Sequence, residues 1–317
     1  MCIRDRIGTK ASEEQCYMGT YHSTRGRTLS CSSKVAIRTG IAPDGGLFVS
    51  DELGTQQLDI SSLADKSYFE IAQDVLGMLL NDYTAEEISA CVDEAYRGTF
   101  ASEEVTPLVK LDAAPGADAP QTYVMELFGG PTSAFKDVAL QMLPRLMART
   151  SAKDGGAERI MIVTATSGDT GGAVANGFLG VEGIDVVVLY PKGRVSDIQE
   201  KQFTTLGRNV TALESEGTFD DCQRLVKSAF ADTELKRQMR LTSANSINVA
   251  RFLPQTFYFF HAYAQLRAQG VTSPIVVSVP SGNFGNLTAG LFARRMGLPV
   301  DRFIAANNAN DTFYEYL

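Results

Sequence analysis

A single lysine, Lys136, lies in a sequence context that could make it a nucleophile. It follows a Gly-Gly-Pro turn and the aromatic Phe135, and the apolar residues after it are typical of a buried helix. At the positive end of such a helix, beside an aromatic ring, we expect the protonated form of the amine to be disfavoured. A lysine with a lowered pKa can form a Schiff base with a carbonyl compound. An exposed lysine in the first turn of an ordinary helix would give the same local sequence.

A glycine-rich segment at residues 280–286 has the composition of an anion-binding turn. Its candidate ligand-binding residues are Gly282, Asn283, Phe284, Gly285 and Asn286. Backbone N–H groups in such a turn, at the start of a helix, can surround a phosphate. The spacing is neither GxGxxG nor a Walker A motif, because no Lys-Ser/Thr pair follows Gly285. Tight packing between a strand and a helix would explain the glycines equally well.

A second turn, TSGDTGG at residues 166–172, offers hydroxyls, backbone N–H groups and one carboxylate. Hydroxyl and N–H groups at the start of a helix suit the carboxylate of a substrate. The candidate residues are Thr166, Ser167, Gly168, Asp169 and Thr170. Capping of the following helix by Ser167 or Asp169 is the structural alternative.

A third polar cluster, NSINVAR at residues 245–251, places Asn245, Asn248 and Arg251 at the start of a long predicted helix. The guanidinium group of Arg251 could hold a phosphate or a carboxylate through two parallel hydrogen bonds. A surface helix cap with a solvated arginine is the alternative. Taken together, a Schiff-base lysine, a phosphate-binding turn and a carboxylate-binding turn indicate pyridoxal phosphate chemistry.

The elements that must position these residues alternate between strand and helix from residue 122 onward. Strands are predicted at 122–127, 159–165, 185–190, 209–214, 275–279 and 303–306, and helices at 138–147, 196–206, 219–230, 248–268 and 287–296, with one more ending at 178. The strands are continuous apolar runs, so we expect them to be buried on both faces. The alternation predicts an α/β fold with doubly wound, mostly parallel sheets in two lobes. Ligands bind at the carboxyl ends of such strands, so Lys136 and the two turns should meet at one edge of the sheet. Pro144 should end or kink the helix after Lys136.

The residues before 113 are predicted to form a mainly helical N-terminal region. Helices are expected at 67–80 and from Thr84 to about residue 96, the second with a capping box between Thr84 and Glu87. The segment 113–120, rich in Ala, Pro, Gly and Asp, is the predicted boundary between an N-terminal domain (18–115) and a catalytic core (116–317). Residues 1–17 show no periodicity, and we interpret them as a non-native leader.

Composition excludes several classes of function. With 44% hydrophobic and 21% charged residues the chain of 317 residues is typical of a globular protein, and its net charge of −8 argues against nonspecific nucleic-acid binding. The five cysteines and two histidines have no metal-ligand spacing, so we predict no metal site, reduced thiols and a cytoplasmic location. No apolar run approaches the roughly 20 residues of a membrane span. The oligomeric state is not indicated.

Six segments, in their order along the chain, resemble the threonine synthases, a family of fold-type II enzymes that depend on pyridoxal phosphate. They are YHSTRG (21–26), APDGGLF (42–48), FGGPTSAFKD (128–137), TSGDTGG (166–172), NSINVAR (245–251) and PSGNFGN (280–286). The resemblance implies that Lys136 carries the cofactor and that residues 282–286 hold its phosphate. It also implies that residues 167–170 face the substrate carboxylate and the ring hydroxyl. Other fold-type II enzymes usually have Asn where Asp169 stands.

The implied reaction is the last step of threonine biosynthesis, in which a carbon–oxygen lyase converts O-phospho-L-homoserine and water to L-threonine and phosphate. Lys136 would act as general base and acid, and Arg251 with Asn245 and Asn248 would hold the substrate phosphate. The family's chain continues beyond residue 317 and there supplies the partner of the pyridine nitrogen, so we expect a C-terminally truncated chain. Two alternatives stay open: another fold-type II lyase, such as a serine/threonine dehydratase, or a non-catalytic relative that binds the cofactor or a phosphorylated ligand.

Overall fold

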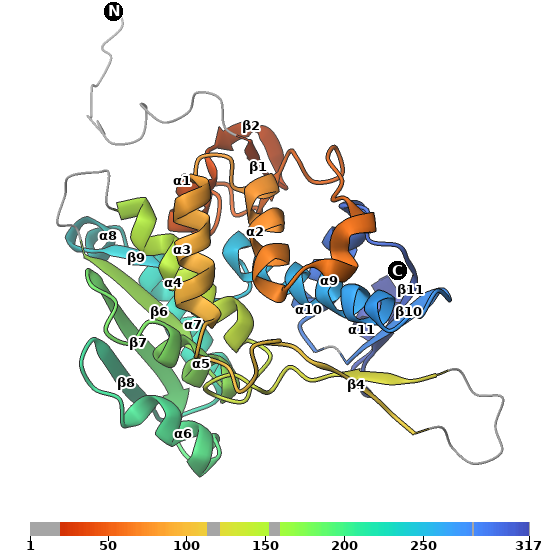
Figure 1. Cartoon of the computed structure of the whole chain (residues 1–317). Helices are drawn as coiled ribbons and strands as arrows, with labels where there is room; N and C mark the ends of the chain where they lie inside the picture. The colour runs from red at the N-terminus through yellow and green to blue at the C-terminus, as the bar shows by residue number, and fades with distance from the viewer. Residues whose placement is uncertain (1–19, 113–120, 152–158, 281, 317) are drawn as a thin grey trace, which may run out of the picture.

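The computed structural model describes residues 20–112, 121–151, 159–280 and 282–316 (Figure 1). The leader predicted at 1–17, the boundary predicted at 113–120 and Ser281 of the glycine-rich segment 280–286 lie outside the described residues. The division of the chain into domains at 115/116 therefore stays a prediction. In the part of the chain that is described, no helix is both long and apolar enough to cross a membrane.

A four-stranded parallel sheet in the order β8-β7-β6-β9 forms one lobe. Its strands are β6 (Ile160–Ala165), β7 (Ile184–Pro191), β8 (Val210–Ser215) and β9 (Arg240–Thr242), connected by α5 (Asp169–Gly177), α6 (Asp197–Thr204), α7 (Phe219–Ala231) and α8 (Thr233–Gln238). Alternate strand residues face two separate apolar clusters: Ile162 and Val186 lie in the main core with α5, whereas Val163 and Leu189 pack with α7. Helices therefore cover both faces of the sheet, as predicted for a doubly wound fold.

A second parallel sheet belongs to the other lobe and contains only β10 (Ile275–Pro280) and β11 (Val300–Ala306) within the described residues. It lies on the far side of α9 (Leu253–Ala268) and α10 (Gly285–Arg295) from the four-stranded sheet (Figure 1). Burial on both faces was the wrong expectation here. Val279 is buried, but Val276 and Ile304 are 46% and 48% exposed on the opposite face.

The N-terminal region packs its helices against the middle of the molecule. It contains β1 (Tyr21–Ser23), β2 (Gly26–Cys31), α1 (Ser33–Thr39), β3 (Phe48–Ser50), the 3-10 helix η1 (Ile60–Asp65), α2 (Tyr68–Leu79) and α3 (Ala85–Tyr96). The predicted capping box is confirmed, since the Glu87 N–H donates to the Thr84 hydroxyl (3.1 Å) and the Thr84 N–H donates to the Glu87 carboxylate (3.0 Å). The three-stranded antiparallel sheet β2-β1-β3 was not predicted. The α/β fold class, with two lobes after a mainly helical N-terminal region, is confirmed.

The strand expected before Lys136 does not join a parallel sheet. It is β5 (Tyr123–Met125), which pairs antiparallel with β4 (Leu108–Lys110) in a separate two-stranded sheet. The strands before the two glycine-rich turns, β6 and β10, also belong to different sheets. The expectation that the three segments meet at one edge of a single sheet is therefore wrong. Side-chain contacts between the lobes bring them together instead.

The helix after Lys136, α4 (Asp137–Ser151), runs through Pro144, so of the two predicted outcomes, an end or a kink, the end is not found. Proline removes the hydrogen bond to the carbonyl four residues earlier, that of Leu140. At this point α5 approaches closely, because a Cβ atom added to Gly177 would lie 2.0 Å from the Leu140 oxygen. Arg145 Nη1 then donates to the carbonyl oxygens of Gln141 (2.9 Å) and Gly177 (3.0 Å). Contacts with α5 therefore stabilise α4 at the point where Pro144 interrupts its backbone hydrogen bonds.

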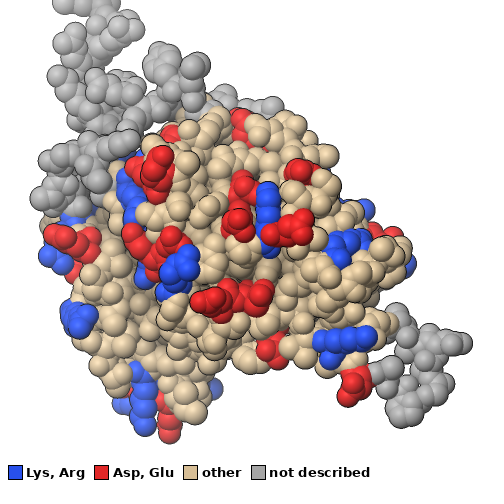
Figure 2. Space-filling model, viewed as in Figure 1, with Lys and Arg blue, Asp and Glu red and all other residues tan. Residues whose placement is uncertain are grey.

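Two short helical elements complete the described chain: the 3-10 helix η2 (Val249–Arg251) and α11 (Thr312–Tyr316). The single helix predicted over 248–268 is thus divided into η2 and α9. On the face of the molecule shown in Figure 2, basic side chains lie apart from one another and mostly beside acidic ones. Charge on this face is mixed rather than gathered into a basic surface.

Candidate active site

The loop before Lys136 is held by the residue after it. Asp137 is completely buried, and its carboxylate accepts hydrogen bonds from the Thr132 N–H (2.8 Å) and the Thr132 hydroxyl (2.6 Å). A Cβ atom on Gly130 would lie 2.6 Å from this carboxylate, so the turn can close tightly only around a glycine. The N–H of Leu140 donates to the Lys136 carbonyl (2.9 Å), which places Lys136 at the start of α4. The backbone that carries the lysine is therefore fixed on both sides.

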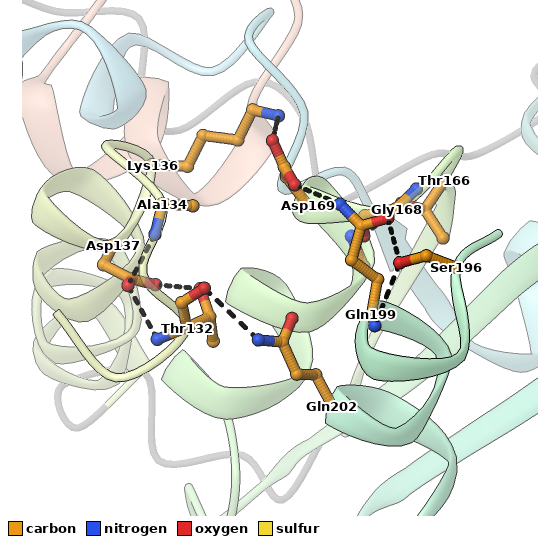
Figure 3. Close-up of polar contacts among 11 residues, drawn as sticks. Thr132, Ala134, Lys136, Asp137, Thr166, Gly168, Asp169, Ser196, Gln199 and Gln202 are labelled. Carbon is orange, nitrogen blue, oxygen red and sulfur yellow. Dashed lines mark hydrogen bonds and ion pairs between the residues drawn. The ribbon is translucent and has the colours of Figure 1, made fainter. Parts of the chain in front are cut away.

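The Lys136 amine lies in a mostly buried position between charges of opposite sign. Its side chain is 17% exposed, and Nζ lies 3.5 Å from Asp169 Oδ2 (Figure 3). Burial lowers the pKa of Lys136, the positive charge of Arg251 lowers it further, and Asp169 opposes both. The lysine is thus not the exposed residue of the alternative interpretation.

The ring of Phe135 was expected to disfavour the protonated form of the Lys136 amine, but its position has the opposite effect. Nζ lies 5.7 Å from the centroid of the Phe135 ring. A cation over the face of an aromatic ring is attracted to it, so this contact favours the protonated amine. The predicted direction of the pKa change is found, but its main cause is loss of contact with water.

The turn at 166–172 is held together by one hydroxyl. Thr166 is buried, and its Oγ1 accepts from the N–H groups of Gly168 (3.0 Å) and Gly171 (2.8 Å) and donates to the Gly168 carbonyl (2.9 Å). The Thr166 side chain therefore stabilises the turn itself. Within the described residues no side chain caps α5, so capping by Ser167 or Asp169 is not observed. Asp169 instead points towards Lys136 (Figure 3).

The turn at 282–286 is open. Phe284 adopts a left-handed conformation with φ of 51°, and α10 begins at the next residue without a side-chain cap among the described residues. A Cβ atom on Gly282 would meet nothing within 4 Å. Gly282 and Asn283 are exposed, and Gly285 is half-buried. This turn presents backbone at the start of a helix to open space.

Lys136, Arg251 and the turn at 282–286 line one cavity of about 200 Å³. Its lining residues are Phe135, Lys136, Ser246, Arg251, Gln255, Pro280, Gly282, Asn283, Phe284, Gly285 and Asn286. The turn at 166–172 joins this cavity through the contact between Asp169 and Lys136. Sequence reasoning missed Ser246 and Gln255, although Gln255 lies four residues after Arg251 and so could have been assigned to the same side of the helical segment.

Asn245 and Asn248 make structural contacts instead of lining the cavity. Asn248 is buried, donates from Nδ2 to the Ile37 carbonyl (2.8 Å) and accepts from the Ala250 N–H (3.0 Å) as the cap of η2. The side-chain oxygen of Asn245 accepts from the Thr164 hydroxyl (2.9 Å). The structure therefore favours the capping alternative for Asn248, whereas the Asn245 side chain contacts β6.

Arg251 is a buried cation at the wall of the cavity. It is 2% exposed, and burial lowers the pKa of its guanidinium group to about 10. Nη1 donates to the Ala244 carbonyl, but Nε has no hydrogen-bond partner among the described residues. A buried donor without a partner is costly, and a buried charge is normally paired. Arg251 is therefore not a solvated surface residue, and its environment suits an anionic ligand.

Two sequence profiles cover almost all of the described chain. The profile of the "Threonine synthase N terminus" matches residues 20–96, and that of the "Pyridoxal-phosphate dependent enzyme" family matches residues 100–317. The chain belongs to the pyridoxal-phosphate dependent enzyme family. The second match includes Lys136 and both glycine-rich turns.

Individual members of this family confirm the resemblance to threonine synthases. The threonine synthase of Haemophilus influenzae is 46% identical over 282 residues, which are 89% of this chain and 62% of the relative. That of Escherichia coli is 43% identical over 283 residues, with the same two shares. The chain spans about three fifths of the length of these relatives.

Solved structures give the same result for the fold. The PLP-bound threonine synthase of Brucella melitensis superposes with a TM-score of 0.81 at 44% identity, covering 90% of this chain and 60% of that one. The yeast threonine synthase superposes with a TM-score of 0.83 at 38% identity, covering 93% and 59%. A diaminopropionate ammonia lyase of Escherichia coli, at 17% identity and a TM-score of 0.52, shares the fold alone.

Proposed function

We propose that this protein is a threonine synthase, which uses pyridoxal phosphate to convert O-phospho-L-homoserine and water to L-threonine and phosphate. The observation that carries the proposal is the cavity in which the Lys136 amine faces the open turn at 282–286 and the buried Arg251. Similarity to threonine synthases over about nine tenths of the chain supports it.

The residues on the cavity wall fit the cofactor. A mostly buried lysine with a lowered pKa is suited to bond covalently to a carbonyl carbon, and that lysine is Lys136. The open backbone at 282–286, before α10, is suited to the cofactor's phosphate. Asp169 is proposed to face the ring hydroxyl, as the resemblance implies. When bound, pyridoxal phosphate supplies an electron sink that stabilises negative charge on the substrate's carbon atoms.

Lys136 is proposed to move protons at the substrate. Because burial lowers its pKa, a larger fraction of the amine is neutral near pH 7 than in an exposed lysine, and the neutral amine can accept a proton. Asp169, with Oδ2 at 3.5 Å from Nζ, stabilises the protonated amine that results. Lys136 can then return the proton to another carbon, so one residue serves as base and as acid.

Arg251 is proposed to hold the substrate's phosphate. Arg251 lines the cavity and carries a positive charge, so a phosphate oxygen in the cavity could accept a hydrogen bond from its guanidinium group. Ser167, Gly168 and Thr170, at the start of α5, are proposed for the substrate carboxylate, as the resemblance implies. Asn245 and Asn248 are not carried into this proposal because their side chains support the backbone around η2.

The cellular location and the partner of the protein are also proposed. Cys91 and Cys222 are buried free thiols, which supports a reducing, cytoplasmic location. A small phosphorylated amino acid is the proposed partner, and nucleic acid is not.

The test is phosphate and threonine formation from O-phospho-L-homoserine by the purified protein with pyridoxal phosphate. Lys136→Ala should abolish both products and the visible absorbance of the bound cofactor. Lys227→Ala, at an exposed position of α7, is the matched control and should retain both. Threonine formation by Lys136→Ala would contradict the assigned role of the lysine.

The same assay separates the alternatives. Faster formation of a keto acid from serine or threonine than of phosphate from O-phospho-L-homoserine would favour a dehydratase. Cofactor absorbance without any product would favour a non-catalytic relative. Either outcome would overturn the proposed function.

A further inference from the structure

Helix α6 contacts two segments that lie beside Lys136 in space: the turn at 166–172 and the loop before the lysine. Both contacts are made by glutamine side chains (Figure 3). Gln199 Nε2 donates to Asp169 Oδ1 (2.5 Å), while the other oxygen of Asp169 faces the Lys136 amine. Gln199 therefore contacts the carboxylate that contacts the lysine. It does not touch the lysine itself.

The second glutamine, three residues further along α6, reaches the other segment. Gln202 Nε2 donates to the Thr132 carbonyl (3.2 Å). Thr132 is the residue whose N–H and hydroxyl are bound by Asp137, directly after Lys136. One face of a single helix thus holds the Asp169 carboxylate and the backbone of the lysine's loop.

The orientation of the Gln199 amide is set by its own helix. The hydroxyl of Ser196, the N-cap of α6, donates to Gln199 Oε1 (2.9 Å). With its oxygen accepting there, the amide presents its NH₂ group to Asp169, and that group can only donate. The Asp169 carboxylate therefore faces a group of Gln199 that can only donate a hydrogen bond to it.

The glycines of the turn at 166–172 make room for these glutamines. A Cβ atom on Gly168 would lie 2.5 Å from Gln199 Oε1, and one on Gly172 would lie 2.6 Å from Gln202 Oε1. Two glycines of the turn are matched to two glutamines of α6. This is the packing expected where two segments must keep a fixed separation.

We propose that Gln199 and Gln202 are positioning residues for Lys136: Gln199 orients the Asp169 carboxylate towards the amine, and Gln202 holds the lysine's loop at Thr132. The inference rests on the proposed function, in which Lys136 is the reacting amine. Without Gln199, a carboxylate that is 49% exposed would turn into solvent. Without Gln202, the loop would lose the hydrogen bond that ties the Thr132 carbonyl to α6.

The two halves of the proposal predict different effects. The charged groups that act on the Lys136 amine are Asp169 and Arg251. Gln199→Ala releases the carboxylate, so the amine loses an opposite charge and titrates at lower pH. Gln199→Glu places a second carboxylate beside Asp169, so the amine titrates at higher pH. A glutamine that only packs would not give shifts of opposite sign.

The measurement is a titration of the Lys136 amine in the chain without cofactor or substrate. Lysine amines are methylated reductively with ¹³C-formaldehyde, and the NMR signal missing in Lys136→Arg is followed with pH. We expect a shift of about 0.5 pH unit downward for Gln199→Ala and of similar size upward for Gln199→Glu. Ile198→Ala, at a 76% exposed position of the same helix, is the matched control and should not shift the titration. Shifts of the same sign, or none, would overturn the role of Gln199.

The role of Gln202 is tested by amide hydrogen exchange of the loop. The N–H groups of Thr132 and Ala134 donate to Asp137, so their exchange reports how firmly the loop is held. Gln202→Ala should raise their exchange about tenfold, which corresponds to about 1.4 kcal/mol, with the lysine titration unmoved. Unchanged exchange would overturn the role of Gln202. Neither measurement uses substrate, so a protein that passes both and releases no phosphate would refute the proposed function alone.

Discussion

The two glycine-rich turns beside Lys136 have similar sequences and different surroundings. In the turn at 166–172, Cβ atoms on Gly168, Gly171 and Gly172 would each lie between 2.5 and 2.6 Å from a neighbouring side chain. In the turn at 282–286, a Cβ atom on Gly282 would meet nothing within 4 Å, and one on Gly285 would make only ordinary contacts at 3.8 and 3.9 Å. The first turn is filled by the protein, whereas the second faces open space.

Glycine therefore has a different structural role in each of the two turns. The first turn is part of the scaffold: its glycines let the Thr166 hydroxyl, the α6 glutamines and the backbone pack closely, and so aim Asp169 at Lys136. The second turn leaves its backbone accessible from the cavity, as a phosphate-bearing ligand requires. A glycine-rich turn is evidence for a ligand only when the protein itself does not occupy the space beside it.

The strongest test of the comparison is Gly168→Ala. Gly168 has φ of 147°, a conformation that an L-residue adopts only with strain, and the added Cβ atom would displace Gln199. Backbone strain and overpacking together should lower the free energy of unfolding by about 3 kcal/mol. Urea denaturation at pH 7 measures the change.

Gly77→Ala is the matched control, because Gly77 lies within α2 and its added Cβ atom would meet nothing within 4 Å. It should raise the free energy of unfolding by about 1 kcal/mol through helix propensity. If Gly168→Ala were no less stable than the wild type, the first turn would not be the packed scaffold described here.

Local patterns predicted much of the fold. Apolar runs located β6, β7, β8 and β10 to within a residue or two. A parallel strand that is buried on both faces must be continuously apolar, and β6 and β7 are largely buried on both faces whereas β10 is not. The same patterns could not say which strands would pair. The short apolar run at β5 looks like a parallel core strand, but it pairs antiparallel with β4, which was not predicted at all.

The candidate site was predicted where its residue types are unusual. Lys136, Arg251 and the turn at 282–286 meet in one cavity, as the sequence and the resemblance suggested. Gln199 and Gln202 could not be found from the sequence, since glutamine on a half-exposed helix is common and indicates no ligand. Their importance depends on the distance between α6 and the first turn, which only the tertiary structure sets.

A smaller change in stability is expected at the lysine between the two turns. In the folded chain burial lowers the pKa of Lys136 below its usual value, so the unfolded chain binds the proton more tightly. Stability therefore increases as pH rises from the folded pKa to the unfolded one, and the full cost of burying the charge is present below the folded pKa. Lys136→Met removes this cost and should raise the free energy of unfolding at pH 7, by less than Gly168→Ala lowers it.

The pH dependence makes this prediction specific. The difference between Lys136→Met and the wild type should shrink as pH rises towards the ordinary lysine value of 10.5, because the folded wild-type amine loses its proton and the buried charge with it. Urea denaturation at pH 7 and pH 10 gives the two values. If Lys136→Met were less stable than the wild type at pH 7, the ion pair with Asp169 would outweigh the cost of burial. The first turn would then stabilise the protonated lysine in the folded chain.

The smallest change in stability is expected in the second turn. Gly282→Ala adds a methyl group where nothing lies within 4 Å, so the free energy of unfolding should change by less than about 0.5 kcal/mol. Because Gly282 lines the cavity, the same methyl group should obstruct the approach of the cofactor's phosphate and weaken pyridoxal phosphate binding by about tenfold. A spectrophotometric titration with the cofactor measures the affinity, with Gly77→Ala as a control that leaves it unchanged. A loss of stability like that of Gly168→Ala, with cofactor affinity intact, would show that both turns are scaffold and that the phosphate binds elsewhere.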